Sequence, residues 1–221
     1  MQNADERRYE WTCVTDSAPF APRDGEGLLC FNGLLWLLGG WNPADQEHFP
    51  NDCNSEVWSS PDGLDWTLVN PAAPWERRHT AGYAVHRGRM WIVGGDPIQG
   101  HYQNDVWSSA DGECWDLVRD DVPWGPRCLH HTVAFGGRIW VMGGQTMPAF
   151  AGATEVFYRD VWCSEDGAEW TRVCESAPWA PRGMIGGAAV LGGRMWLLGG
   201  GTYDTPTTPT RKMYNLSLIH I

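Results

Sequence analysis

Four arginines recur along the sequence, each at the end of a short segment that also holds a proline and an aromatic residue. The segments are APFAPR, APWERR, VPWGPR and APWAPR, and they end in Arg23, Arg78, Arg127 and Arg182. A guanidinium group can clamp a carboxylate through two parallel hydrogen bonds, so four of them around one surface would suit an acidic ligand. Because the arginine occurs in every segment, it could equally hold its own loop. Both interpretations stay open at this point.

Histidines and aromatic residues close to these arginines are further candidates for ligand contact. His79 follows Arg78 directly, His130 and His131 follow Arg127 within four residues, and Trp41 and Tyr102 lie in long polar segments. No spacing typical of metal ligands accompanies the histidines. The sequence therefore predicts polar loop residues without a metal or a cofactor, and the candidate ligand contacts beside the arginines are His79, His130, Trp41 and Tyr102.

Charge and composition restrict the class of partner and the compartment. The formal net charge is −11 at pH 7, whereas a nucleic-acid-binding protein needs a basic face for phosphates, so we expect no nucleic acid. No apolar run approaches the ~20 residues of a membrane helix, so we expect no membrane partner. The first ten residues also lack the apolar core of a secretory signal peptide. The seven cysteines form no CxxC pair, which favours free thiols in a reducing compartment and hence a cytoplasmic location.

The dominant pattern is a repeat marked by tryptophan, which accounts for 15 of the 221 residues. One tryptophan in each unit precedes a Gly-Gly pair, at steps of 55, 49 and about 55 residues. Since the pattern recurs in every unit, we expect the tryptophans to pack unit against unit and the glycines to allow close backbone approach. The residues predicted to be structural are Trp36 with Gly39 and Gly40, Trp91 with Gly94 and Gly95, Trp140 with Gly143 and Gly144, and Trp196 with Gly199 and Gly200.

Each unit has the pattern of four short strands, expected in the second unit at about 81–86, 89–94, 105–109 and 114–118. The first two strands are joined by a turn with glycine at its tip, as in FNGL and HRGR, and the last two by segments such as SPDGLD. Asn-Gly and Asp-Gly supply the positive φ angles that tight hairpin turns require. Four-stranded antiparallel units repeated at about 50 residues predict an all-β fold of the β-propeller type.

These units resemble kelch repeats. The resemblance rests on Pro-Arg, an apolar strand, an aromatic residue before Gly-Gly, an Asp-Val-Trp strand and a last tryptophan strand, and it covers about residues 8–215. It implies a kelch-type β-propeller of four-stranded antiparallel blades, with about four blades present. We expect a single strand at 8–14, then blades at about 18–69, 73–118, 122–173 and 177–215. The fourth blade has its third strand at about 211–215 and lacks its last. Kelch rings more often hold five to seven blades, so we expect an incomplete ring, a metagenomic fragment of a larger parent.

The last six residues, LSLIHI, break the repeat. Every earlier unit continues here with a Ser-x-Asp-Gly turn and a tryptophan strand. The peptide is also the translation of CTG-TCT-CTT-ATA-CAC-ATC, the end of a common transposase adapter for sequencing libraries. We therefore expect residues 216–221 to be a non-native tail and the gene to be cut at about codon 215. The alternatives are a genuine apolar strand and a four-bladed ring closed by the strand at 8–14.

Function is expected at the end of the units that carries the long, varied loops. In an antiparallel meander, the connections between the second and third strands share one end with the links that hold the four arginines. Varied loops on a rigid scaffold are where binding sites usually lie. The sequence thus predicts a binding or interaction module for a protein or peptide ligand, and the arginines favour an acidic one.

The alternative is the propeller domain of a carbohydrate-active or galactose-oxidase-like enzyme. Galactose-oxidase-like copper enzymes carry kelch-type propellers but need a Tyr–Cys cross-link, a second tyrosine and two histidines, and no such set can be assigned here. A sialidase needs three convergent arginines, whereas these are equivalent from unit to unit. SPDGLDW also lacks one residue of the sialidase Asp box, so Asp62, Asp111 and Asp166 are predicted to form turns. No catalytic residue is assigned.

Overall fold

The computed structural model describes residues 10–98, 101–146, 155–183, 187–202, 212–214 and 217–219. These residues form an all-β structure, in which the one short 3-10 helix is η1 (Pro50–Asp52) and no helix is long and apolar enough to cross a membrane. The strands are β1 (Gly27–Phe31), β2 (Leu34–Leu38), β3 (Val57–Ser60), β4 (Thr67–Asn70), β5 (Gly82–His86), β6 (Arg89–Val93), β7 (Val106–Ser109), β8 (Asp116–Arg119), β9 (His131–Phe135), β10 (Arg138–Met142), β11 (Gln145–Thr146), β12 (Val156–Phe157), β13 (Val161–Ser164), β14 (Trp170–Cys174), β15 (Gly187–Leu191), β16 (Arg194–Leu198), β17 (Gly201–Thr202), β18 (Lys212–Met213) and β19 (Ser217–Ile219).

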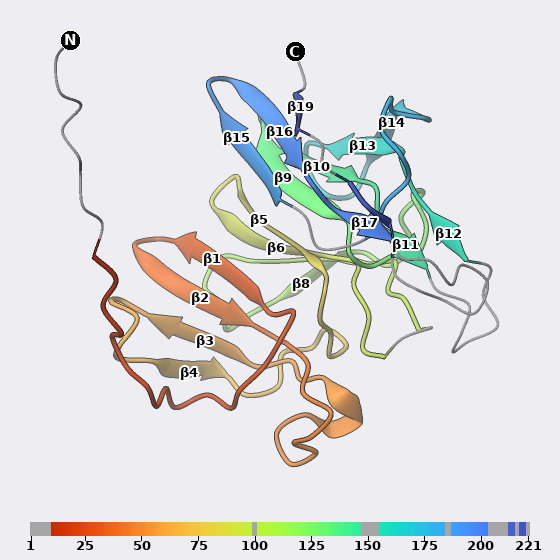
Figure 1. The fold of residues 1–221 in the computed structure, drawn as a ribbon. Coiled ribbons are helices and arrows are strands. Elements are labelled where there is room, and N and C mark those ends of the chain that lie inside the picture. Colours follow the sequence, from red (N-terminus) through yellow and green to blue (C-terminus); the bar gives the residue numbers. More distant parts are fainter. Residues whose placement is uncertain are drawn as a thin grey trace, which may run out of the picture.

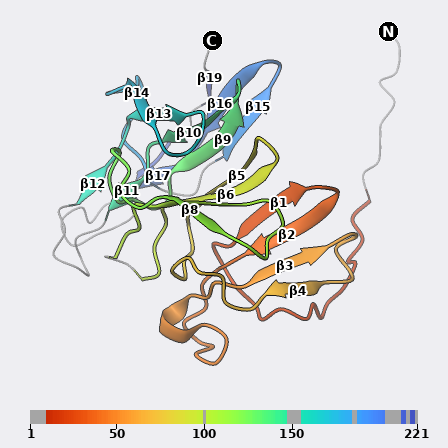
Figure 2. The same ribbon diagram turned by 180° about the vertical axis from the view of Figure 1, so that it is seen from behind.

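The strands form four main sheets, numbered here in chain order. Sheet 1 is β1-β2-β3-β4, sheet 2 is β5-β6-β7-β8, sheet 3 is β9-β10-β13-β14, and sheet 4 has the three strands β15-β16-β19. The pairs β11–β12 and β17–β18 form two short ribbons. The first strands contact each other in succession, β1 with β5, β5 with β9, and β9 with β15, so the sheets follow one another around a common interior (Figures 1 and 2). The described sheets do not close into a ring.

The first hairpin of each sheet follows directly from the turn residues. Asn32 and Gly33 both have positive φ angles, 51° and 77°, and so do Arg87 and Gly88, at 48° and 68°. Two successive positive φ angles define the type I′ turn, whose twist matches that of the flanking strands. The hairpin predicted for the second unit is thereby confirmed, with β5 and β6 within one residue of the expected bounds.

The turns between the last two strands of each sheet are held by a serine and an aspartate. In sheet 2, the Ser109 hydroxyl accepts a hydrogen bond from the backbone N–H of Gly112 at 2.8 Å. The Asp111 carboxylate accepts from the backbone N–H groups of Glu113 and Cys114 at 3.0 and 2.8 Å. The predicted role of the aspartates as turn formers is confirmed, since Asp62 and Asp166 make the same bonds.

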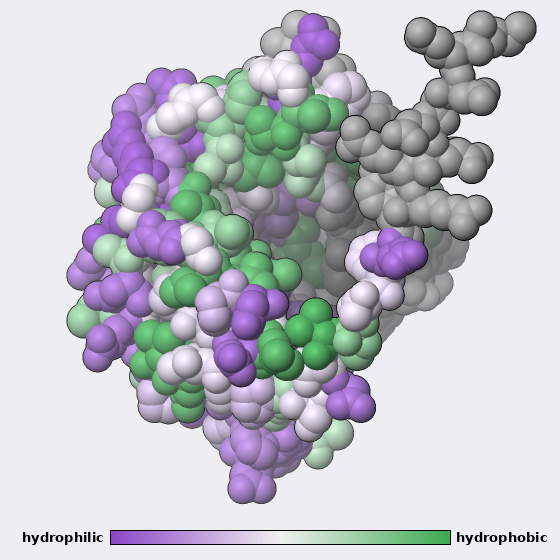
Figure 3. All heavy atoms as spheres, turned by 90° about the vertical axis from the view of Figure 1, so that its left-hand side faces the viewer, coloured by the Kyte–Doolittle hydropathy of each residue, from purple (hydrophilic) through white to green (hydrophobic). Residues whose placement is uncertain are grey.

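The sheets have two different ends. All the first hairpins and the Ser-x-Asp-Gly turns lie at one end, which we call the turn end, on the left of Figure 1. The long connections between second and third strands, with η1 and the β11–β12 ribbon, lie at the opposite or loop end. Figure 3 looks onto the turn end and shows hydrophobic residues gathered around a hollow. Three exposed apolar residues belong to the first strands of the two outermost sheets: Leu28, Val190 and Leu191.

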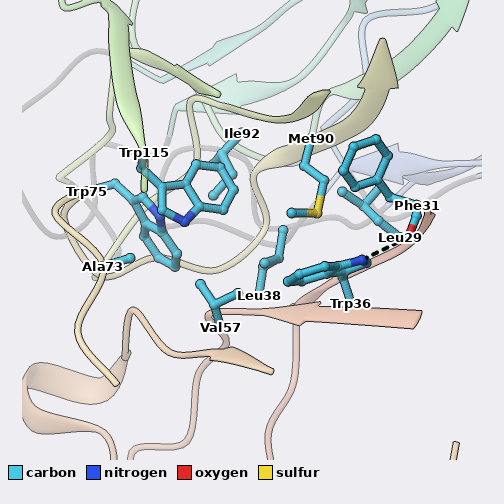
Figure 4. Close-up of a cluster of buried hydrophobic side chains, with 10 residues drawn as sticks. All are labelled: Leu29, Phe31, Trp36, Leu38, Val57, Ala73, Trp75, Met90, Ile92 and Trp115. Atoms are coloured by element: carbon cyan, nitrogen blue, oxygen red, sulfur yellow. Dashed lines mark hydrogen bonds between the residues drawn. The ribbon is translucent and has the colours of Figure 1, made fainter. Parts of the chain in front are cut away.

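The apolar core lies between successive sheets. In the first cluster, Trp36 and Leu38 of sheet 1 pack with Met90 and Ile92 of sheet 2, and Figure 4 shows these side chains pointing toward one another. A second cluster joins sheets 2 and 3 in the same way, around Val93 and Ile139 among others. Sheet 2 packs against sheet 1 on one side and sheet 3 on the other, and both of its faces are accordingly apolar. The repeat of aromatic and branched residues in every unit is what permits this stacking.

Two expectations at the ends of the repeat were wrong. No strand forms in residues 10–14, the described part of the expected strand at 8–14, and Trp11 is 98% exposed. A strand needs a neighbouring strand with free backbone groups, and no described strand pairs with this segment. The third strand of the fourth unit was expected at 211–215. Instead β18 pairs with β17, and β19 pairs with β16, Trp196 lying opposite Ile219. In the fourth unit a two-residue ribbon, β17–β18, comes before the third strand of the sheet, as β11–β12 comes before β13 in the third unit. The third strand of sheet 4, β19, therefore begins later in the sequence than expected. Residues 216, 220 and 221 of the expected tail lie outside the described residues.

Candidate functional site

The four arginines singled out by the sequence each lie in the segment that precedes a sheet, at the loop end. Arg78, Arg127 and Arg182 are fully buried, and the side chain of Arg23 is 2% exposed. A buried charge is costly unless it is paired and hydrogen-bonded. The partners of each guanidinium group therefore decide what the arginine does.

Arg78 shows the pattern most clearly. Its Nη1 donates to the Gly94 carbonyl at 2.9 Å and to the Asp105 carboxylate at 2.6 Å, and its Nη2 donates to the other Asp105 oxygen at 2.8 Å. Its Nε donates to the Glu76 carbonyl at 2.9 Å. This is the two-pronged carboxylate clamp anticipated for a ligand, but the carboxylate is supplied by the same unit of the chain.

The arginine–carboxylate pair recurs in the first and third units, through one guanidinium nitrogen in the first and through two in the third. Arg23 pairs with Glu56 at 2.7 Å, and Arg127 pairs with the two oxygens of Asp160 at 2.7 and 3.1 Å. Each carboxylate also accepts a hydrogen bond from a tryptophan indole two residues later; these indoles belong to Trp58, Trp107 and Trp162, at 2.7–2.9 Å. We call this set the arginine–acid–tryptophan clamp. It gives a physical reason for the recurring acid-Val-Trp sequence and corresponds to the loop-holding interpretation of the arginines.

The Gly-Gly pairs let the links approach the sheets. Gly94 and Gly95 have φ angles of 57° and 103°, and the N–H of Gly95 donates to the Arg127 carbonyl at 3.0 Å. A Cβ atom on Gly94 would lie 2.9 Å from that carbonyl oxygen, closer than packed atoms tolerate. The other predicted glycines, at 39–40, 143–144 and 199–200, also have positive φ angles.

A matched pair of substitutions separates backbone strain from steric conflict. Gly94→Ala and Gly88→Ala both place an alanine at positive φ, but a Cβ at Gly88 meets no atom within 4 Å. We expect Gly94→Ala to lower the free energy of unfolding by about 1–3 kcal/mol more than Gly88→Ala, measured by urea denaturation. Equal losses would show that the close approach to Arg127 does not matter.

Two of the tryptophans before the Gly-Gly pairs, Trp36 and Trp91, pack against the turn of the next sheet. The Trp91 indole donates to the His86 carbonyl at 2.9 Å, and its ring lies against Gly167 in the turn of sheet 3. Trp36 meets Gly112 of sheet 2 in the same way. Trp140 and Trp196 make the equivalent indole bonds to the carbonyls of Phe135 and Leu191.

Trp41 and His79 form a stacked pair at the loop end, which we call the Trp41–His79 platform. Their ring centres are 5.8 Å apart and their planes are inclined by 19°. Trp41 is half-buried and is held by backbone bridges to Asp24 and Cys53. The His79 side chain is 15% exposed, and its Nδ1 donates to the Asp96 carbonyl at 2.9 Å. The two predicted ligand contacts are thus adjacent and partly open to solvent.

A buried carboxyl group supports this platform. Asp96 is 2% exposed, lies 3.5 Å from His79 Nδ1, and accepts a hydrogen bond from the Thr80 hydroxyl at 2.6 Å. Burial raises the pKa of Asp96, while His79 and Thr80 favour the ionised form and offset part of that rise. Asp96 and Thr80 were missed by sequence reasoning, because Asp96 follows only one of the Gly-Gly pairs and no repeat marks it.

Cys53 also lies beside His79, but it is not placed to act as a nucleophile. Its Sγ is 3.5 Å from His79 Nδ1, a distance that would suit a cysteine–histidine pair. Burial raises the pKa of the Cys53 thiol, so the reactive thiolate is disfavoured. The same Nδ1 is engaged by the Asp96 carbonyl. Across the described ranges, no group of three His, Cys, Asp or Glu side chains is arranged to hold a metal ion.

His130 and His131 lie in the interior and not on the platform. Both are buried, and the His130 ring is 5.8 Å from the ring of Trp124. Burial, followed by the charge of Arg127, lowers the pKa of His130 to about 3, and burial lowers the pKa of His131 to about 4. Both side chains are therefore neutral at pH 7. His130 was predicted as a ligand contact, but the structure places it under the loop end.

The lowered pKa values of His130 and His131 predict how the free energy of unfolding depends on pH. Between pH 6.5 and 5 the unfolded chain takes up protons on both histidines, whereas the folded chain does not, so stability falls as the pH falls. We expect a loss of about 1 kcal/mol per pH unit from each histidine. Urea denaturation at a series of pH values measures the slope, and His130→Gln should reduce it. A slope unchanged by that substitution would contradict the buried, neutral state of His130.

The remaining candidate, Tyr102, lies in the long loop of sheet 2. Tyr102 is half-buried, and in the sequence it lies between His101 and Gln103. The Nε2 atom of His101 lies 3.1 Å from a Glu76 oxygen. Ile98 in the same loop is 50% exposed. This loop and the platform are connected, since Ile98 lies two residues beyond Asp96.

A cavity of about 360 Å³ lies at the opposite, turn end of sheet 3. Its lining includes Arg138, Glu165 and Asp166. Arg138 is paired with Glu165 at 3.0 Å, and Asp166 is engaged by its own turn. The polar groups of this cavity are thus occupied by structural contacts, which makes the loop end the better candidate.

Comparison with protein-family models finds none that matches this chain, and comparison with curated proteins finds no match either. The function must therefore be argued from the geometry of the loop end.

Proposed function

We propose that this chain is a kelch-type β-propeller with an incomplete ring and that it serves as a binding module. Three observations support the fold: three of the four main sheets are four-stranded and antiparallel, the first strands of the sheets contact one another in succession, and the clamp recurs in three units. The exposed Leu28 and Leu191, in the outermost sheets, support an incomplete ring, because further sheets would cover them.

We further propose that the loop end binds a protein or peptide segment at the Trp41–His79 platform. The observation that carries this proposal is a half-buried tryptophan stacked on an imidazole that donates a hydrogen bond to the backbone carbonyl of the buried Asp96. Aromatic residues with a fixed orientation contribute strongly to binding because little side-chain entropy is lost. Ile98, which is 50% exposed and lies two residues beyond Asp96, is a further exposed apolar side chain in the loop that follows.

The clamp arginines change the proposed mode of binding an acidic ligand. Since Arg23, Arg78 and Arg127 already hold carboxylates of the chain, they offer little to a ligand. A ligand carboxylate would instead be received by His79, whose side chain is 15% exposed at the loop end. We therefore propose that the arginines build the scaffold and that the platform makes the contact.

Selection from a phage-displayed peptide library, with the whole chain immobilised, tests this proposal. We expect selected peptides to lose at least about tenfold in affinity on Trp41→Ala, the loss of one central aromatic contact. Leu64→Ala is the control, since Leu64 is 49% exposed at the turn end, and it should leave affinity unchanged. Failure to select any peptide, or equal losses in the two variants, would overturn the proposal.

A further inference from the structure

Inside the chain, a tryptophan of one sheet fits against a glycine in the turn of the next sheet. The ring of Trp36 in sheet 1 lies against Gly112 in sheet 2, and the ring of Trp91 in sheet 2 lies against Gly167 in sheet 3. A Cβ atom on either glycine would lie 2.2 or 2.3 Å from a ring carbon, so only a glycine leaves room for the ring. We call such a turn glycine a tryptophan seat.

The two outermost sheets each hold one half of such a contact. Gly63 has the place in sheet 1 that Gly112 has in sheet 2, but a Cβ atom there would meet only Leu35, at 3.7 Å. Trp196 is the corresponding tryptophan of sheet 4 and is half-buried, whereas Trp36 is 5% exposed. Among the described residues, the seats of sheets 2 and 3 are filled and that of sheet 1 is empty. An empty seat and an unseated tryptophan therefore lie at opposite ends of the row of sheets (Figure 1).

The outer face of sheet 4 repeats the face by which sheet 1 packs on sheet 2. In sheet 1 that face includes Phe31 and Leu38, which are 5% and 0% exposed. The strand register places Leu191 at the position of Phe31 and Leu198 at that of Leu38. These two leucines of sheet 4 are 70% and 45% exposed. We call Leu191, Trp196 and Leu198 the presenting face.

The outer face of sheet 1, in turn, repeats the face by which sheet 2 receives sheet 1. In sheet 2 that face includes Tyr83 and Met90, which pack in the cluster between the two sheets. The strand register places Leu28 at the position of Tyr83 and Leu35 at that of Met90. Leu28 is 63% exposed, because successive side chains of a strand point to opposite faces and only the other face of β1 packs on sheet 2. We call Leu28, Leu35 and Gly63 the receiving face.

We infer that the presenting face of one copy of this chain binds the receiving face of a second copy, with Trp196 of the one against Gly63 of the other. Continuity with the contacts inside the chain identifies a second copy as the occupant, because the two faces carry the two halves of a contact that the chain already makes between successive sheets. Each copy uses two different patches, so copies join head to tail and either close into a ring or extend. The inference does not depend on peptide binding at the platform.

Two variants, each of which blocks one face, test this contact in the full chain. Leu28→Arg places a charge on the receiving face and Leu191→Arg places one on the presenting face, both at mostly exposed positions that tolerate arginine in the monomer. Sedimentation velocity over a concentration series measures association. We expect each variant alone to associate at least about tenfold more weakly than the unsubstituted chain. An equimolar mixture of the two should form one-to-one complexes, since each variant keeps the face that the other needs. Ile98→Arg, at a 50% exposed position of the loop end, is the control and should associate as the unsubstituted chain does.

An unsubstituted chain that stays monomeric over the whole series would overturn the inference and leave the two faces to a different protein or to further sheets. Association that persists in either variant, or that the mixture does not restore, would overturn it too, since it would indicate a contact between two like faces. Where a variant does not fold, alkylation of the unsubstituted chain, followed by mass spectrometry, decides. Cys30, which is exposed beside Leu28 on the outer face of sheet 1, should react more slowly as the protein concentration rises, whereas Cys114, exposed in the turn of sheet 2, should not change. Equal behaviour of the two thiols would contradict the proposed contact.

Discussion

Replacing Asp105 with alanine is expected to lower the free energy of unfolding by about 3–5 kcal/mol, because it leaves a buried guanidinium group without its counter-charge. Arg78 is fully buried and directs two nitrogens at Asp105, at 2.6 and 2.8 Å. The Trp107 indole, which donates to the same carboxylate at 2.7 Å, loses its acceptor too. Urea denaturation followed by tryptophan fluorescence measures the loss.

Asp116→Ala is the matched control for this prediction. It also removes an aspartate paired with an arginine, Arg89, but the Asp116 side chain is 72% exposed and the Arg89 side chain 32%. Solvent screens such a pair, so its removal should cost no more than about 1 kcal/mol. Similar losses for the two variants would mean that the clamp is no more than a surface ion pair.

The second large effect is expected from Trp124→Ala, which should cost about 3–5 kcal/mol. Trp124 is 3% exposed and meets Trp170 edge to face, with ring centres 5.8 Å apart. It also lies beside Arg127, whose guanidinium carbon is 5.5 Å from the Trp124 ring centre. Removing the indole therefore opens a cavity between the link and sheet 3 and loosens the clamp above it.

Trp11→Ala provides the comparison, since it deletes the same side chain from a position that is 98% exposed. We expect a change within about 0.5 kcal/mol. A loss comparable with that of Trp124→Ala would show that Trp11 packs against another part of the protein in solution, as the strand expected at 8–14 requires.

The parts of the fold that could be predicted are those fixed by neighbouring residues. Asn32-Gly33 and the turn around Asp111 form their hydrogen bonds within a few residues, so the sequence alone locates them. The strand at 8–14 could not be predicted in this way. A strand exists only where a distant partner offers backbone groups, and the local sequence of Trp11 is the same whether or not that partner is present.

The candidate site was predictable in its residues but not in their roles. The arginines and the acid-Val-Trp segments were both evident as repeats, yet their pairing spans 27 residues for Arg78 and Asp105 and 33 for Arg127 and Asp160. Only the folded chain brings them together. The contact of Trp41 with His79 likewise depends on the link between sheets 1 and 2, and Asp96 occurs in one unit alone.

Side-chain NMR of the tryptophans would test most directly whether the loop end is the binding face. The indole resonances of ¹⁵N-labelled protein, assigned by single substitutions, would be followed during titration with a peptide selected from the library. Binding at the platform predicts that the Trp41 resonance shifts most, and that Trp170, whose indole is bonded to Gly167 at the turn end, stays in place. A shift of Trp170 with Trp41 unmoved would place the ligand at the turn end and contradict the proposed function.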